Sequence, residues 1–96
     1  MRYFHRTSLP LDEVMAEADR YFGERLECTE SGPKSRRFSG AVGNVRITAE
    51  AEGGHYTLVT ATTDQLGESE LDKLTKRFLT LVHKKVDKQH VVRGAY

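Results

Sequence analysis

Apolar and polar residues alternate most regularly between Asn44 and Asp64. Two runs rich in β-branched and aromatic residues here flank the dipeptide Gly53-Gly54. Glycine adopts the positive φ angles of a tight hairpin turn without steric strain, so the pattern predicts a β-hairpin with a two-residue loop. Because side chains alternate between the two faces of a strand, this loop also determines which residues share a face.

The two-residue loop predicts one core face and one open face for the hairpin. The core face comprises Val45, Ile47, Ala49, Ala51, Tyr56 and Leu58. The open face comprises Arg46, Thr48, Glu50, Glu52, Thr57, Val59 and Ala61. A further strand over Arg36–Val42 joins the hairpin across a Gly43-Asn44 loop, which places Phe38 opposite Ala49 on the core face and Arg37 opposite Glu50 on the open face.

Shorter runs of strand character cover Arg2–Thr7 and Leu26–Glu30, and the second of these places Cys28 on the core face. Residues 11–22 have the 3.6-residue apolar period of an amphipathic helix, which Gly23 ends. A second helix is predicted over residues 70–88, followed by a flexible or docked tail over residues 89–96. Its wide apolar stripe consists of Leu71, Leu74, Phe78, Leu79, Leu81, Val82 and Val86. We expect one core that contains Phe22, Phe38, Ile47, Leu58, Leu74 and Phe78.

These elements follow the order β-α-β-β-β-β-α, which predicts an α+β fold of two layers. One antiparallel five-stranded sheet would be covered on one face by both helices. This element order is similar to that of the TATA-box-binding-protein-like and helix-grip folds, which combine a curved antiparallel sheet with a long C-terminal helix. The similarity concerns element order alone, so no functional residue follows from it.

Composition limits the classes of protein to consider. The 96 residues are enough for one domain, and a net charge of +1 argues against a molecule that is basic all over. The single cysteine excludes an internal disulfide, which fits a reducing cytoplasm, and there is no apolar run of the roughly 20 residues that a membrane span needs. We therefore expect a cytoplasmic protein of one domain, residues 1–96.

The sequence offers little catalytic or cofactor chemistry. The Gly-Ala-Val-Gly run of residues 40–43 precedes a strand, whereas a phosphate-binding loop precedes a helix. The four histidines are not spaced to chelate a metal along one helix, and Cys28 has no recognisable base partner. We expect no cofactor and no metal, and a non-catalytic protein is favoured over an enzyme.

The predicted open sheet face is the first candidate binding surface. Its small apolar and hydroxyl side chains would let another surface approach closely, although a solvated, threonine-rich face explains them equally well. The interface candidates are Arg37, Arg46, Thr48, Thr57, Val59 and Ala61. The leading hypothesis is a small binding or assembly module that contacts a protein through this face, most simply as a homodimer centred on Val59.

The basic side of the last helix is the second candidate surface. Its members are Lys73, Lys76, Arg77, Lys84 and Lys88. They could bind a nucleic acid or another anionic surface, or they could be solvated side chains that complement the helix dipole. Nucleic-acid binding through this helix is the alternative hypothesis, less favoured than a protein contact.

Overall fold

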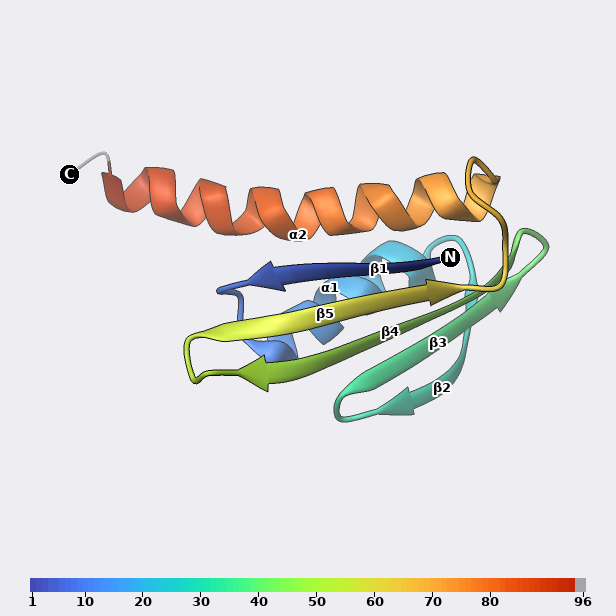
Figure 1. Cartoon of the computed structure of the whole chain (residues 1–96), viewed down its shortest axis with the longest axis horizontal. Coiled ribbons are helices and arrows are strands. Elements are labelled where there is room, and N and C mark those ends of the chain that lie inside the picture. Colours follow the sequence, from blue (N-terminus) through green and yellow to red (C-terminus); the bar gives the residue numbers. More distant parts are fainter. Residues whose placement is uncertain (95–96) are drawn as a thin grey trace.

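The computed structural model describes the backbone of residues 1–94 and the side chains of residues 1–85 (Figure 1). The elements in chain order are β1 (Arg2–Thr7), α1 (Leu11–Gly23), β2 (Glu27–Gly32), β3 (Ser35–Gly40), β4 (Gly43–Glu52), β5 (Tyr56–Thr63) and α2 (Glu70–Gly94). The predicted α+β class and the β-α-β-β-β-β-α order are both confirmed.

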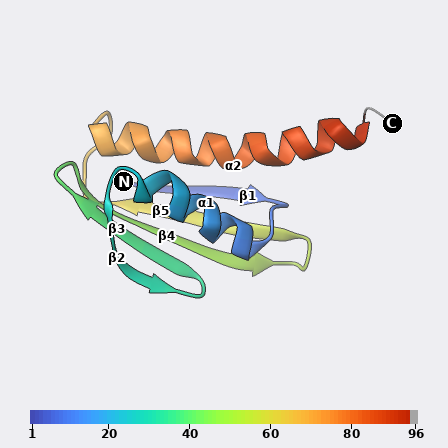
Figure 2. The same ribbon diagram turned by 180° about the vertical axis from the view of Figure 1, so that it is seen from behind.

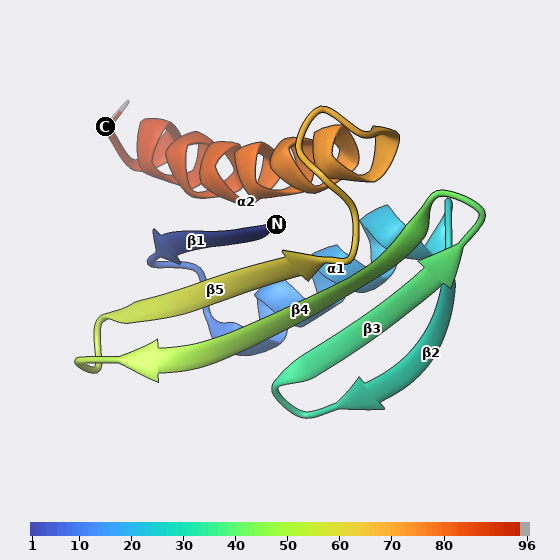
Figure 3. The same ribbon diagram turned by 45° about the vertical axis from the view of Figure 1, so that its right-hand side comes forward.

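The five strands form one antiparallel sheet in the order β1-β5-β4-β3-β2, which Figure 3 shows in sequence across the molecule. Both helices lie on the same side of this sheet (Figure 2). α1 packs over β2, β3 and β4, while α2 contacts β1, β5 and β4. The other side of the sheet is not covered by any described element, so it is the open face.

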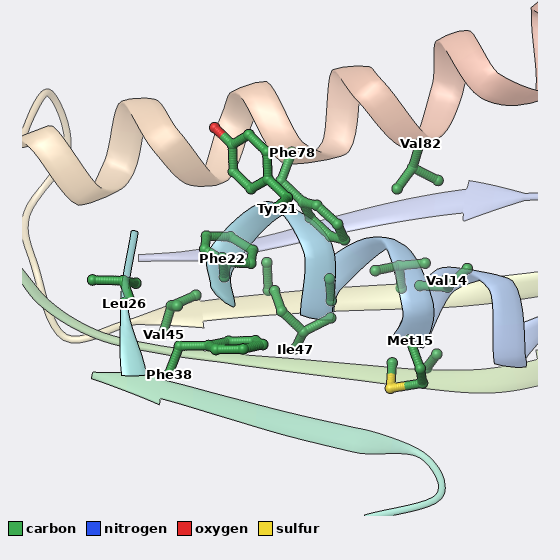
Figure 4. Close-up of a cluster of buried hydrophobic side chains, with 14 of the residues drawn as sticks. Val14, Met15, Tyr21, Phe22, Leu26, Phe38, Val45, Ile47, Phe78 and Val82 are labelled. Atoms are coloured by element: carbon green, nitrogen blue, oxygen red, sulfur yellow. The ribbon is translucent and has the colours of Figure 1, made fainter. Parts of the chain in front are cut away.

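The core lies between the sheet and the two helices, and aromatic rings form its centre (Figure 4). The Phe22 ring stacks on Phe38 with centroids 5.3 Å apart and contacts Phe78 at 5.1 Å. Ile47 is fully buried beside them, as predicted, and Leu74 packs against the cluster while partly exposed. Leu81 is 37% exposed, so it lies outside the apolar stripe to which the sequence assigns it.

Side-chain contacts hold α2 against β1 and α1. The carboxylate of Asp72 is buried in the first turn of α2 and accepts a hydrogen bond from the Tyr3 hydroxyl of β1. Ser69 caps the helix, since its hydroxyl accepts a hydrogen bond from the Asp72 amide at 3.1 Å. Further along, Lys85 Nζ lies 3.1 Å from the carboxylate of Glu17 on α1. These contacts fix which side of α2 faces the core.

The β4–β5 hairpin corrects the predicted register by one residue. Glu52 pairs with Tyr56, so the loop comprises three residues, Gly53, Gly54 and His55. Both glycines have positive φ angles, 66° and 78°, and the third loop residue moves β5 by one position. Because side chains alternate along a strand, this shift exchanges the two faces of β5.

The exchange of faces moves three of the predicted interface residues into the core. Thr57, Val59 and Ala61 are buried under the helices, whereas Tyr56 and Leu58 lie on the open face. The predictions that placed Thr57, Val59 and Ala61 on the open face, and Leu58 in the core, are therefore wrong.

The β3–β4 hairpin differs from its prediction by a shift that preserves the faces. Gly40 pairs with Gly43 around an Ala41-Val42 loop, so Phe38 lies opposite Val45 rather than Ala49. Phe38 nevertheless remains on the core face as predicted. On the open face, Arg37 lies opposite Arg46 in place of Glu50.

Two other expectations change at the edges of the fold. Cys28 pairs with buried Phe38 and so keeps the predicted core side, but it is exposed on the edge strand β2, where the pairing with β3 is irregular between Cys28 and Glu30. α2 continues to Gly94, which means that residues 89–94 of the predicted tail are helical. Residues 95–96 lie outside the described part of the chain.

Candidate functional site

Three arginines align across the open face of the sheet. Arg46 on β4 lies directly opposite Arg37 on β3. On its other side Arg46 pairs with Thr62 of β5, which in turn pairs with Arg2 of β1. Strands lie about 4.8 Å apart, so the three positions span about 14 Å across four strands. We call Arg2, Arg46 and Arg37 the arginine row.

The arginine row is poorly neutralised by the protein itself. Arg37 has a loose ion pair with Glu30 at 3.9 Å. Within the described part of the chain, Arg2 and Arg46 have neither an ion pair nor a side-chain hydrogen bond. Like charges directly opposite each other on neighbouring strands destabilise a sheet, so the row does not contribute to stability. Because guanidinium groups suit carboxylate and phosphate groups, the row is a candidate site for an external anion.

A surface hollow of about 270 Å³ adjoins the row and includes Arg37, Arg46 and Thr62 in its lining. Asp64 lies at the rim of this hollow, where its carboxylate accepts hydrogen bonds from the Asn44 amide at 2.9 Å and from Asn44 Nδ2 at 2.7 Å. Together with Gln65 these donors lower the pKa of Asp64 to about 2. The Asp64 carboxylate therefore has its hydrogen-bond partners within the protein, and it links the end of β5 to the start of β4.

An exposed aromatic side chain lies beside the arginine row. Phe4 of β1 is 63% exposed and lies opposite Thr60, two residues along the strand from Arg2. Two residues of a strand span about 7 Å, so the ring is one row away from the guanidinium groups. The same row continues with the small hydroxyl side chains of Thr48 and Ser35.

The opposite end of the open face has a different charge. Tyr56, 52% exposed, pairs with Glu52 there, and Glu52 forms a 2.5 Å ion pair with Arg6. Glu50 lies next to them on β4 without an ion pair in the described structure. The open face therefore has a basic end at the arginine row and an acidic end at Glu50 and Glu52.

The structure thus keeps Arg37, Arg46 and Thr48 of the predicted interface residues on the open face and removes the other three. Because Val59 is fully buried, a homodimer centred on it has no structural basis. Phe4 is the functional candidate that the sequence interpretation missed. The available signal was the alternation in β1, which places Phe4 on the same side as Arg2 and Arg6.

The basic side of α2 forms a second positively charged surface. Four of the five predicted basic residues, together with Thr80 and Leu81, line a hollow of about 540 Å³, which we call the lysine hollow. Its lining is Lys73, Lys76, Arg77, Thr80, Leu81 and Lys84. The side chain of Lys88 lies outside the described residues. The charge of Lys76 is partly neutralised within the protein, since its Nζ lies 3.1 Å from the buried carboxylate of Asp72. This carboxylate also raises the pKa of Lys76.

Two histidines that are distant in sequence meet between β1 and α2. The rings of His5 and His83 lie 5.7 Å apart in an edge-on arrangement, and Nε2 of His5 is buried without a hydrogen-bond partner among the described residues. Burial, and to a lesser extent the charge of His83, lowers the pKa of His5. Among the described residues no three His, Cys, Asp or Glu side chains gather to form a metal site.

Comparison with models of protein families, with curated proteins and with solved structures found no significant match. In the described part of the chain, neither helix combines the length and apolarity that a membrane span requires. The two basic surfaces, the arginine row and the lysine hollow, are therefore the features that bear on function.

Proposed function

We propose that this protein is a small non-catalytic binding module that captures an anionic partner on the open face of its sheet. The observation that supports this proposal is the arginine row, in which Arg46 and Arg2 have no ion pair with any described residue and lie beside the exposed ring of Phe4. Arginine guanidinium groups present several donors in a fixed plane, which suits phosphate and carboxylate groups.

A second copy of the chain is a less suitable partner for this face. A two-fold contact could place the basic end of one copy on the acidic end of the other. The acidic end of each copy would then meet two unpaired arginines, Arg2 and Arg46, with only one unpaired carboxylate, Glu50, because the other unpaired carboxylate described on this face, Glu27, lies beside the arginine row on β2. One arginine per copy would be buried without a counter-charge, which is costly. The predicted homodimer thus remains a prediction, and its charges argue for a different partner.

The lysine hollow supports a second candidate function, the binding of a polyanion along α2. Lys73, Arg77 and Lys84 line it, and none of the described acidic residues does. Lysine is a flexible point charge, however, and within residues 1–85 no exposed aromatic side chain lines the hollow, so this surface would bind polyanions with little selectivity.

Retention on immobilised heparin, measured as the salt concentration needed for elution, tests both surfaces together. We expect wild type to be retained on the column. The Arg2→Gln/Arg46→Gln variant should elute at clearly lower salt, because it makes fewer contacts with the anion and therefore releases fewer counterions on binding. Arg6→Gln is the matched control, because Arg6 is already paired with Glu52. The Lys73→Gln/Arg77→Gln/Lys84→Gln variant tests the lysine hollow.

The outcomes of this experiment separate the two candidates. A loss confined to the variant of the arginine row supports the open face. A loss confined to the α2 variant contradicts the leading proposal and supports the second candidate. If the wild-type protein is not retained even at low salt, both candidate functions are contradicted.

A further inference from the structure

We infer that the anionic partner of the open face is a single-stranded nucleic acid, with its phosphates on the arginine row and a base stacked on Phe4. This inference rests on the proposed function, because it requires the open face to bind an anion. It goes further by naming a class of partner from the combination of charge and aromatic surface.

Phe4 is the side chain that distinguishes a nucleic acid from other anions. Its ring is 63% exposed in the middle of an edge strand, between Arg2 and Arg6, on a face that packs against nothing in the described structure. Every base has a flat π-face, so stacking on an aromatic side chain is a sequence-tolerant way to hold a single strand. A phenylalanine two positions, about 7 Å of backbone, along the strand from the arginine row can accept a base while the adjoining phosphates contact the arginines.

The surface between the aromatic ring and β3 allows a strand of nucleic acid to approach. The positions beside Phe4 are Thr60, Thr48 and Ser35, all of them short hydroxyl side chains. Their hydroxyl groups donate and accept hydrogen bonds, and their small size lets another surface approach the sheet closely. A sheet face with short side chains, an exposed aromatic ring and flanking positive charge is suited to unpaired bases rather than to the grooves of a duplex.

Three other partners explain fewer of the observations. An acidic peptide would match the arginines but leaves the exposed ring without a purpose. In a duplex the bases are stacked inside, so Phe4 would have no base to contact. A second copy of the chain would leave an unpaired arginine on each side, as argued above.

Fluorescence anisotropy with a labelled oligo-dT of about 12 nucleotides, which is within the usual site size of small single-strand binders, measures the interaction directly. Matched probes are an RNA of equal length, a duplex of equal length and labelled poly-glutamate. We expect the single strands to bind more tightly than the duplex and poly-glutamate. Phe4→Ala should weaken binding of the single strand by about 5- to 100-fold, the range for loss of one base–aromatic stack.

The molecule supplies matched controls for both parts of the site. Tyr56→Ala removes another exposed aromatic ring, at the acidic end of the same face, and it should leave the affinity unchanged. Arg46→Gln should reduce the slope of log affinity against log salt by about 0.7, the value for one phosphate contact in a single strand. Arg6→Gln should leave this slope unchanged, because Arg6 is paired with Glu52.

Each alternative outcome identifies what is wrong. Equal affinity for duplex and single strand, or a Phe4→Ala variant with wild-type affinity, overturns the single-strand inference. If the single strands do not bind but heparin retention still depends on Arg2 and Arg46, the inference fails and the proposed function survives. Tighter binding of poly-glutamate than of either single strand assigns the face to an acidic protein instead. Circular dichroism of every variant confirms that changes in affinity do not reflect unfolding.

Discussion

The two faces of the sheet use alternate residues of the same strands for different purposes. On β4 the core face presents Val45, Ile47 and Ala49, all of them buried, while Arg46 between them is exposed on the open face. The core face therefore contributes apolar burial, and the open face contributes unbalanced charge and an exposed ring. Neighbouring residues should consequently respond to substitution in opposite ways, one through stability and the other through binding.

The largest expected difference is between two neighbours on β5. Val59→Glu places a carboxylate in the core, where desolvation of an unpaired ion costs several kcal/mol, and this approaches the whole stability of a small domain. Thr60→Glu adds the same charge to the open face and should leave a folded protein with a cooperative thermal transition. Circular dichroism melts of the two variants decide the matter. If Val59→Glu were folded and Thr60→Glu unfolded, Thr60 rather than Val59 would face the core, and the assignment of the two faces of β5 would be wrong.

The next effect compares the two sides of α2. Phe78 is fully buried, with its ring 5.1 Å from Phe22 and 5.8 Å from Tyr21. Phe78→Ala should lower the free energy of unfolding by about 3–5 kcal/mol, as large-to-small changes in cores do. Leu81→Ala, three residues further on but exposed, should change it by less than about 0.5 kcal/mol. Urea denaturation of both variants tests the assignment, and comparable losses would mean that Leu81 also packs into the core.

These comparisons show why some of the fold was predictable and some was not. The prediction for the β3–β4 hairpin was shifted by an even number of residues, which kept Phe38 on the correct face. The β4–β5 hairpin was shifted by one, because His55 joins the two glycines in the loop, and every residue of β5 changed sides. Local sequence does not distinguish a two-residue from a three-residue loop here, since Gly53 and Gly54 suit both.

The candidate site depended on the same distinction. Arg37, Arg46 and Thr48 were predictable because their strands keep the expected alternation. For Phe4 the alternation in β1 indicates a face shared with Arg2 and Arg6, but not which face is open, because that is determined by the pairing of β1 with β5, more than fifty residues away in the chain. The contact between His5 and His83 is likewise invisible in sequence, because it depends on how α2 lies across β1.

A smaller effect is expected from pH at the seam between β1 and α2. The pKa of His5 is lowered in the folded protein by burial and by His83, so the unfolded state binds a proton more readily. Stability should be complete above about pH 6.5, the usual pKa of histidine, and should decrease as the pH falls through the folded-state pKa of His5. Thermal melts between pH 7.5 and pH 5 should show this decrease in wild type and a weaker one in His5→Gln. His55→Gln, in the exposed loop, is the control, and a decrease of the same size in His5→Gln as in wild type would assign the effect to other groups.

The smallest expected change is an increase in stability rather than a loss. It tests whether the arginine row serves binding rather than stability. Arg46→Gln relieves the repulsion between directly opposed Arg46 and Arg37, so it should raise the free energy of unfolding by about 0.2–1 kcal/mol at low salt. The gain should shrink as ionic strength increases, because the interaction between exposed charges is screened.

Arg6→Gln provides the contrast, because it breaks an exposed ion pair with Glu52 and should lower stability by at most about 1 kcal/mol. Urea denaturation of both variants at low and high salt gives the two signs. If Arg46→Gln is less stable than wild type at low salt, Arg46 supports the fold and the main argument for an external anion is lost. If it is more stable and also binds less tightly, the open face keeps a charge that costs stability, as expected for a surface shaped by its partner.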